Sequence, residues 1–176
     1  MNEIIIKKKV IILGANAVGK TSILNSFIYR KFESDYKATL GVNIIAKDYI
    51  TKDKITVGFS FWDMGGQKLF RNIYPRFFSL ANAAMIVYDV TRMDSFDDII
   101  NWHNSVLTYI PEQIPILLVG NKIDLVDQRV VSSSMAQDLV KQHHFHYIET
   151  SAKTGENVNL AFKKLAEIFA QVFVTP

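Results

Sequence analysis

One eight-residue segment near the start of the chain restricts the possible folds more than any other part of the sequence. Two glycines five positions apart are followed at once by a lysine and a threonine, and the segment comprises Gly14, Ala15, Asn16, Ala17, Val18, Gly19, Lys20 and Thr21. Residues 10–13 before it are apolar, as in a buried strand, and residues 22–28 after it have the apolar spacing of a helix. A glycine-rich turn between a strand and a helix predicts a phosphate-binding loop.

The chemistry of this loop indicates a nucleoside triphosphate and its divalent cation. The glycines allow successive backbone N–H groups to point inward around an anion, and the following helix directs its positive dipole end to the same place. The Lys20 ammonium can reach the outer phosphates, while the Thr21 hydroxyl is a hard oxygen ligand for Mg²⁺. We assign six further residues to the same site: Gly14, Asn16, Ala17, Val18, Gly19 and Ser22. The alternative is an ordinary glycine-bearing turn, which the flanking strand and helix patterns disfavour.

Strand-like and helical patterns alternate along the rest of the chain. We expect strands over residues 4–13, 42–50, 55–62, 83–88, 114–119 and 147–150, and helices over residues 20–29, 95–109, 132–142 and 158–173. A short polar turn at residues 51–54 predicts a hairpin between the second and third strands. The alternation predicts the α/β fold of a P-loop NTPase: one doubly wound, mostly parallel sheet of six strands with about five helices. Ligands of such a sheet bind outside the carboxyl ends of its strands.

Composition limits the remaining possibilities. With 176 residues, 49% of them hydrophobic, the chain is expected to form one domain over residues 1–176. The net charge of +3 is mild, and the basic run at residues 7–9 is more typical of an exposed strand edge than of a nucleic-acid surface, so we expect no nucleic-acid partner. The lack of cysteine excludes disulfides and thiolate metal sites and suits a cytoplasmic protein. Without a membrane-length apolar run or a lipidation motif, membrane association is expected only through a partner or a missing tail.

A second candidate segment ends the predicted strand over residues 55–62. An acidic residue at the end of an apolar strand suits a magnesium site, so we expect Asp63 to be the partner of Thr21. Gly66 lets a backbone N–H approach a terminal phosphate. Gln67 has both a donor and an acceptor with which to orient a water for in-line attack. Taken alone, the segment could also be a simple glycine turn.

Base selection is the role expected for the segment Asn121-Lys122-Ile123-Asp124, which follows a central strand. A carboxylate can accept two parallel hydrogen bonds from guanine, whereas adenine would leave Asp124 unpaired, so the segment favours guanine. The alkyl stem of Lys122 can lie over the purine ring, and Asn121 can tie neighbouring loops together. A further segment after the last strand could support the base through backbone N–H groups; its residues are Ser151, Ala152 and Lys153.

In this order and spacing, these segments resemble the Ras superfamily of small GTPases over residues 9–169. The resemblance implies a molecular switch that binds GTP or GDP with Mg²⁺ and hydrolyses GTP slowly. It implies that Thr39 senses Mg²⁺ and the γ-phosphate, that Phe32 lies at the edge of the base and that Tyr36 covers the phosphates. The candidate catalytic residues are Gln67, Lys20 and Thr39, and the candidate metal-binding residues are Thr21, Thr39 and Asp63.

The resemblance also implies protein partners: effectors selective for the GTP state, an exchange factor and an activating protein. We expect a monomer. No arginine of this chain is assigned to the phosphates, because all five stand in surface-like contexts, namely Arg30, Arg71, Arg76, Arg92 and Arg129. An activating protein is therefore expected to supply one, which accelerates hydrolysis by about 10³ to 10⁵.

Within the superfamily, residues 37–42, 87–91 and 149–158 look most like the Rab branch. Residues 62–67, with Pro75 soon after, are similar to the Arf branch, and Lys68 reverses the charge that Rabs place beside the glutamine. By resemblance to Rabs, a hydrophobic triad on the effector face comprises Ile44, Trp62 and Phe77. The alternative is that all three are core residues.

Two other functions remain open at this point. One is an ATP-using P-loop kinase or ATPase, against which Asp124 argues. The other is a scaffold that holds nucleotide with negligible hydrolysis, against which Thr39 and Gln67 argue. The histidine-rich run at residues 143–146 could suggest a metal site, but adjacent histidines leave a helix end in different directions, so a solvated helix terminus is expected.

Overall fold

The structure, a computed structural model, describes residues 5–30, 41–65 and 74–174 of the 176-residue chain. The strands are β1 (Ile5–Leu13), β2 (Val42–Ile50), β3 (Thr56–Met64), β4 (Ala83–Asp89), β5 (Ile116–Asn121) and β6 (His146–Thr150). The helices are α1 (Lys20–Tyr29), α2 (Tyr74–Phe78), α3 (Met93–Asp97), α4 (Ile99–Tyr109), α5 (Ser133–His143) and α6 (Val158–Val174), with a 3₁₀ helix η2 (Val126–Gln128).

The strands form one six-stranded sheet in the order β2-β3-β1-β4-β5-β6. Only β2 runs antiparallel to its neighbour, because the turn at residues 51–54 joins it to β3 as a hairpin. The remaining pairs are parallel. This arrangement confirms the predicted mostly parallel α/β sheet, and it brings the carboxyl ends of β1, β3, β4, β5 and β6 to one edge of the sheet.

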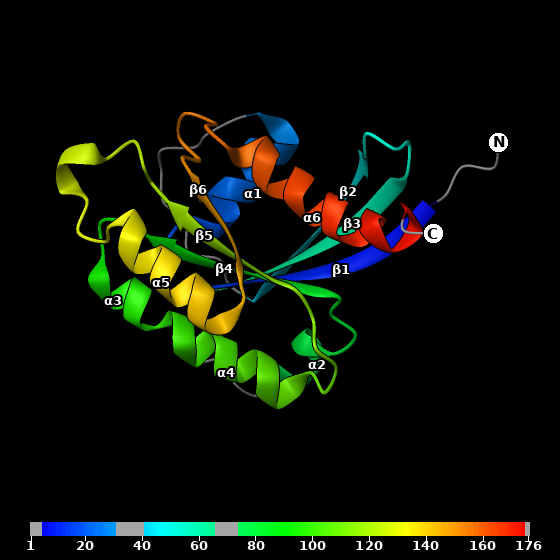
Figure 1. The fold of residues 1–176 in the computed structure, drawn as a ribbon, viewed down its shortest axis with the longest axis horizontal. Helices are drawn as coiled ribbons and strands as arrows, with labels where there is room; N and C mark the ends of the chain where they lie inside the picture. Colours follow the sequence, from blue (N-terminus) through cyan, green and yellow to red (C-terminus); the bar gives the residue numbers. More distant parts are fainter. Residues whose placement is uncertain (1–4, 31–40, 66–73, 175–176) are drawn as a thin grey trace.

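Helices cover both faces of the sheet (Figure 1). Successive residues of a strand point to opposite faces, so Val10 and Ile12 join the core under α1 and α6, while Ile11 and Leu13 join the core on the side of α2 to α5. Strands buried on both faces need the nearly continuous apolar runs that the sequence contains. The sheet is therefore packed on both faces, and it carries the described site residues at its carboxyl edge.

Some element boundaries differ from the expected ones. The helix predicted over residues 95–109 is divided at Asp98, whose φ of −75° and ψ of −9° interrupt the helical repeat. The first of the two helices, α3, begins at Met93 rather than at residue 95, and the Ser95 hydroxyl donates to the Arg92 carbonyl oxygen. The strand β5 begins after Pro115, which has no N–H to donate, and ends on Asn121.

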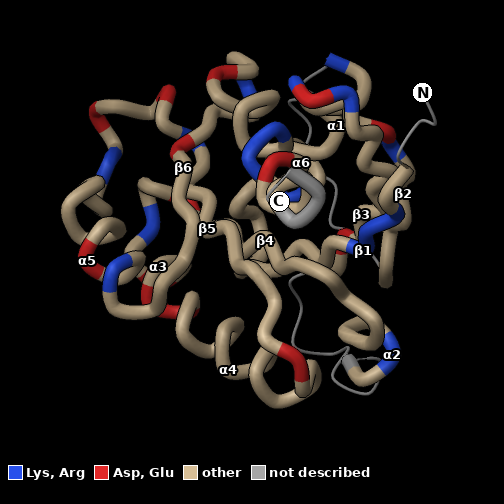
Figure 2. Tube along the Cα trace, turned by 45° about the vertical axis from the view of Figure 1, so that its right-hand side comes forward, with Lys and Arg blue, Asp and Glu red and all other residues tan. Residues whose placement is uncertain are grey.

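The basic run at residues 7–9 lies on the part of β1 that extends beyond β4. Pairing with β4 begins only at Val10, so residues 5–9 have β3 as a strand neighbour on one side. The Lys9 ammonium lies over the Trp62 ring, 3.6 Å from its centroid, and donates to the Ser79 carbonyl oxygen. Lysine and arginine residues are spread over several elements and interspersed with acidic ones (Figure 2). Within the described ranges, no helix has the length and apolar character needed to span a membrane.

Candidate nucleotide site

The loop between β1 and α1 has the backbone conformation that its glycines allow. Gly14 and Gly19 have φ values of +140° and +99°. A Cβ atom at Gly14 would lie 2.2 Å from the Val87 carbonyl oxygen, and one at Gly19 would lie 2.2 Å from the Asn121 amide nitrogen. Both positions therefore require glycine for its positive φ and for the close approach of neighbouring atoms. Ala17, with φ of +63°, is a non-glycine residue in the left-handed region.

Lys20 begins α1 and lies across the mouth of this loop. Its Nζ donates to the carbonyl oxygens of Gly14 and Ala15 at 2.9 and 2.8 Å, and the side chain is only 6% exposed. Burial lowers the pKa of Lys20 to about 8, although the nearby Asp63 carboxylate opposes this shift. A partly desolvated cation at the first residue of a helix favours an anionic ligand.

Next to Lys20, the side chains of Thr21 and Asp63 meet. The Thr21 hydroxyl donates to Asp63 Oδ2 at 2.5 Å. Asp63 is the residue before the last of β3 and is fully buried, and among the described residues its Oδ1 has no hydrogen-bond partner. Burial raises the pKa of Asp63, while the Thr21 hydrogen bond and the Lys20 charge lower it. A buried carboxylate oxygen without a partner, beside a threonine hydroxyl, suits the surroundings of a divalent cation.

Among the described residues, few protein ligands lie at this point. The described part of the chain contains no group of three or more histidine, cysteine or acidic side chains placed to hold a metal ion. Mg²⁺ characteristically keeps several waters and binds through one or two protein oxygens together with substrate phosphates. The Thr21 and Asp63 pair fits that cation better than it fits a metal held wholly by protein.

At the end of β5, Asn121 joins three segments of the site. Its amide nitrogen donates to the Val18 carbonyl oxygen in the phosphate loop at 2.9 Å. Its amide oxygen accepts from the Thr150 hydroxyl and from the Ala152 N–H, both at 3.1 Å. Asn121 is 1% exposed, so the buried amide has partners on both of its atoms. The phosphate loop and the two segments expected to hold the base are thereby fixed relative to one another.

Asp124 lies partly exposed beyond Asn121 and is held by Ser151. The Ser151 hydroxyl donates to Asp124 Oδ1 at 2.6 Å and accepts from the Thr154 N–H at 3.1 Å. Lys122, which lies between Asn121 and Asp124 in the sequence, adopts a left-handed conformation with φ of +70°. Its ammonium lies 2.6 Å from Asp89 Oδ2. A half-exposed carboxylate with one oxygen already oriented can still accept further hydrogen bonds from a ligand.

A Ras family sequence profile matches residues 9–171, which is nearly the whole chain. The chain belongs to the Ras family. It is therefore a GTP-binding switch protein of the general Ras type, and members of this family are generally GTPases. The six-stranded sheet with its helices is the P-loop GTPase fold of the family.

The structure of this Ras family chain brings together most of the predicted site residues. At one end of the site, the phosphate loop with Lys20 and Thr21 meets Asp63. At the other end, Asn121 contacts Ala152 and Asp124 contacts Ser151, while Lys122 pairs with Asp89. Lys153 is exposed and Ser22 is half-buried. Five predicted residues lie outside the described ranges: Phe32, Tyr36, Thr39, Gly66 and Gln67.

Sequence reasoning missed three polar residues near the site. Asp89, at the carboxyl end of β4, pairs with Lys122 and could have been found by the strand-end rule that identified Asp63. Arg92 lies at the surface, as expected, and Arg129 is half-buried, but both have specific partners that were not expected. Arg92 donates to the Asn16 carbonyl oxygen at 2.7 Å, and Arg129 forms a two-pronged ion pair with Glu149. These partners are 76 and 20 residues away in the sequence, so no local pattern indicated them.

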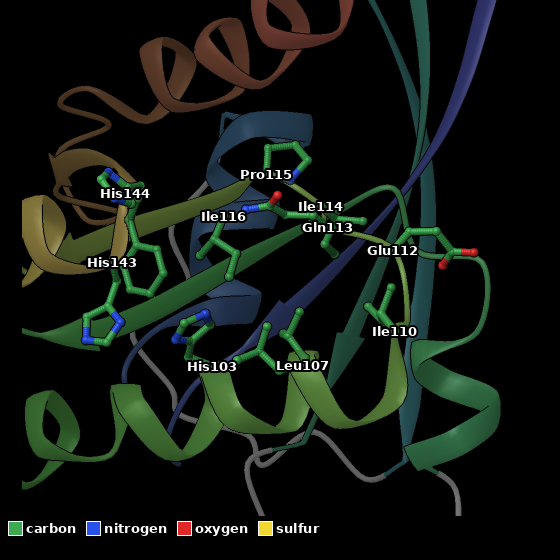
Figure 3. Close-up of a pocket in the computed structure, with 12 residues that line it drawn as sticks. His103, Leu107, Ile110, Glu112, Gln113, Ile114, Pro115, Ile116, His143 and His144 are labelled. Carbon is green, nitrogen blue, oxygen red and sulfur yellow. The ribbon is translucent and has the colours of Figure 1, made fainter.

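The histidines lie at the opposite end of β5 from Asn121. The helix α5 ends at His143, and His144 follows in a left-handed conformation, as expected for a helix terminus. A cavity of about 300 Å³ opens between α4, the end of α5 and the start of β5, and His103 and His143 both line it (Figure 3). Their rings pack edge to face with centroids 5.2 Å apart, and burial together with the neighbouring His143 lowers the pKa of His103. This cavity is separate from the nucleotide site.

Proposed function

We propose that this protein is a magnesium-dependent guanine-nucleotide switch that hydrolyses GTP to GDP and phosphate, with residues 1–176 forming a single GTPase domain. The observation that carries the proposal is the contact between Thr21 and the buried Asp63 beside the Lys20 ammonium. It joins a hydroxyl, a carboxylate and a cation at the mouth of the phosphate loop. Thr21 and Asp63, together with Thr39, would hold Mg²⁺, which when bound neutralises negative charge on the phosphates.

Hydrolysis in this proposal is attack on the γ-phosphate by a water that Gln67 orients. The amide of Gln67 offers one acceptor and two donors, enough to contact both the water and the phosphate. Lys20 stabilises the charge on the transferring phosphoryl group, and the Gly66 N–H supports its terminal oxygens. Phe32 and Tyr36 cover the base and phosphates by resemblance to the superfamily.

The intrinsic rate is expected to be low. Among the described residues, Arg92 contacts the phosphate loop by donating to the Asn16 carbonyl oxygen, and it also donates to Asp94, so its guanidinium already has protein partners. An activating protein that supplies an arginine would accelerate hydrolysis by about 10³ to 10⁵. Hydrolysis would then act as a timer for the GTP state.

Guanine is the base that Asp124 favours in this proposal. The Ser151 hydrogen bond orients Oδ1 of Asp124, which supports a role for this carboxylate as acceptor for the N1–H and exocyclic amine of guanine. An ATP-using kinase or ATPase would instead need a site that tolerates adenine. Competition of labelled GTP by excess ATP separates the two, because a guanine-specific site should be displaced by GTP and not by ATP.

The test of hydrolysis is single-turnover phosphate release from the GTP complex of Gln67→Leu, measured beside the wild type with and without Mg²⁺. Loss of the water-orienting amide should slow release by about 10-fold or more while leaving GTP affinity near normal, since the side chain acts on the transition state rather than on bound GTP. Equal rates in both proteins would assign water positioning to another residue. Absence of release from the wild type would favour a nucleotide-holding scaffold.

We further propose a Rab-like role with GTP-selective effectors, an exchange factor and an activating protein, in signalling or membrane-traffic regulation by a cytoplasmic monomer. The support is the sequence resemblance, with the Arf-like segment and Lys68 as departures that bear on the exchange factor. On the candidate effector face, Ile44 lies opposite Trp62 in the β2–β3 register and is 53% exposed. Phe77 is buried and packs its ring against Trp62, so it supports this face from within.

A further inference from the structure

Glu149 is the centre of a polar cluster next to the candidate base site. Its carboxylate accepts from both terminal nitrogens of Arg129 at 2.8 and 2.9 Å, from the Ser133 hydroxyl at 3.0 Å and from the Tyr147 hydroxyl at 2.8 Å. The side chain is 19% exposed. A two-pronged arginine pair of this kind fixes geometry as well as charge, because the planar guanidinium matches the carboxylate. Burial would raise the pKa of Glu149, but the hydrogen bonds from Arg129, Tyr147 and Ser133 hold it below its usual value.

The partners of Glu149 come from both segments that surround the base. Arg129 lies five residues beyond Asp124, at the end of η2, and so anchors the far end of the 121–129 loop. Glu149 itself lies two residues before Ser151, whose hydroxyl holds Asp124. The Glu149 carbonyl oxygen also accepts from the Asn157 amide, which braces the other end of the 150–157 segment. The Arg129–Glu149 ion pair and the Asp124–Ser151 hydrogen bond therefore connect the same two parts of the chain, the 121–129 loop and residues 149–151.

The same cluster supports the strand end that carries Asn121. The hydroxyls of Tyr147 and Tyr88 lie 3.1 Å apart, and the Tyr88 ring packs directly beneath Gly120, where a Cβ atom would come within 2.6 Å of the Tyr88 hydroxyl. Tyr88 is fully buried, so its hydroxyl depends on Tyr147 for a partner. Through Tyr147, Glu149 therefore also constrains the segment from which the base-binding residues start.

We infer that Glu149 is a positioning residue for guanine recognition: it clamps the 121–129 loop to the 150–157 segment and thereby sets where the Asp124 carboxylate lies. The inference rests on the proposed guanine site. Asp124 discriminates through two hydrogen bonds whose geometry must be met together, so a looser clamp should weaken discrimination and not only affinity. Glu149 does not itself reach the base and acts through Arg129 and Ser151.

The test compares GDP with IDP, whose hypoxanthine base lacks the exocyclic amine of guanine. Wild-type protein should prefer GDP by about 10- to 100-fold, the value of one hydrogen bond to a charged group. In Glu149→Gln, two of the Arg129 donors face an amide rather than a carboxylate, and the GDP-to-IDP affinity ratio should fall by about 3-fold or more. The matched control is Glu167→Gln, which removes the same charge from the Lys163–Glu167 pair on α6 and should leave the ratio unchanged.

The outcomes are distinguishable. A fall in the ratio in Glu149→Gln, and not in the α6 control, supports the clamp. If the affinities for GDP and IDP weaken equally, or if neither changes, the inference is overturned. Glu149 would then not affect discrimination between the two bases. A wild-type ratio near one would contradict the proposed guanine site itself. If Glu149→Gln does not fold, the GDP-to-IDP affinity ratio is measured for Arg129→Lys instead. This variant keeps the positive charge but loses the two-pronged geometry.

Discussion

Lys20 shows at the scale of a single residue how burial changes chemistry. Its ammonium is desolvated within the phosphate loop, and this lowers its pKa to about 8 from its usual value of 10.5. The protonated form is the one that attracts phosphate, so nucleotide affinity should depend on pH in a range where exposed lysines do not titrate. The pH dependence of nucleotide affinity therefore tests whether Lys20 is the cation that binds the phosphates.

We therefore expect GDP affinity to be constant up to about pH 8 and to fall above it, by up to about 10-fold at pH 9, because Lys20 of the free protein must first be protonated. The sign for folding is opposite: between pH 8 and 10.5 the unfolded chain binds more protons at this position than the folded one, so the stability of the nucleotide-free protein rises through that window. Equilibrium titration with fluorescent GDP from pH 7 to 9.5 measures the first effect. Lys20→Met should bind GDP weakly and without the pH dependence. If the GDP affinity of this variant also fell above pH 8, a group other than Lys20 would be responsible for the titration.

Asp124 carries the second prediction at the residue scale. In Asp124→Asn, an amide donates where the carboxylate accepted, and xanthine offers a carbonyl oxygen at that position, so preference should move from guanine toward xanthine nucleotides by about 10-fold or more. Competition binding with GDP and XDP measures this directly. If Asp124→Asn kept the wild-type preference for GDP, the assignment of Asp124 to the base site would be wrong. The Ser151 contact at 2.6 Å should survive the change, because the amide oxygen still accepts.

At the scale of elements, the phosphate loop depends on how closely β1 approaches β4. A Cβ atom at Gly14 would lie 2.2 Å from a backbone oxygen of β4, which cannot move without disturbing a central strand. Gly14→Ala should lower the free energy of unfolding by more than about 2 kcal/mol. Gly155→Ala is the matched control, since Gly155 also has a positive φ but has no atom within 4 Å of the added Cβ. It should cost about 1 kcal/mol. Urea denaturation measures both, and equal losses would show that the clash is relieved by local movement.

At the scale of the whole molecule, the output of the proposed switch depends on the surface formed by β2 and β3. Trp62 is half-buried between Lys9 and Phe77, and its indole N–H donates to the Ser60 hydroxyl. If this surface contacts an effector, ordering of the neighbouring segments by GTP would make it available in one nucleotide state only.

Trp62→Ala should therefore keep nucleotide binding and hydrolysis while losing a GTP-selective partner, identified by comparing proteins captured by the GTP and GDP forms. Ile44→Ala is the companion variant, because Ile44 is exposed beside Trp62 and its truncation should not disturb the core. Loss of capture in both variants, with unchanged melting and nucleotide affinity, supports an effector face. Unfolding of Trp62→Ala with normal capture by Ile44→Ala would make Trp62 a core residue.

Local sequence determined the parts of this protein whose physics is local. The phosphate loop follows from two glycines, a lysine and a threonine in a fixed spacing, and the sheet follows from apolar runs that alternate with helical patterns. Asp63, Asn121 and Asp124 could be found because polar residues at strand ends converge in such a sheet. Tertiary structure alone decided the contacts between distant segments: the burial that shifts the pKa of Lys20, the Arg92 bond to the phosphate loop, and the cluster around Glu149. Those contacts depend on how far strands extend and which loops meet at the edge of the sheet, and no periodicity or short motif encodes that information.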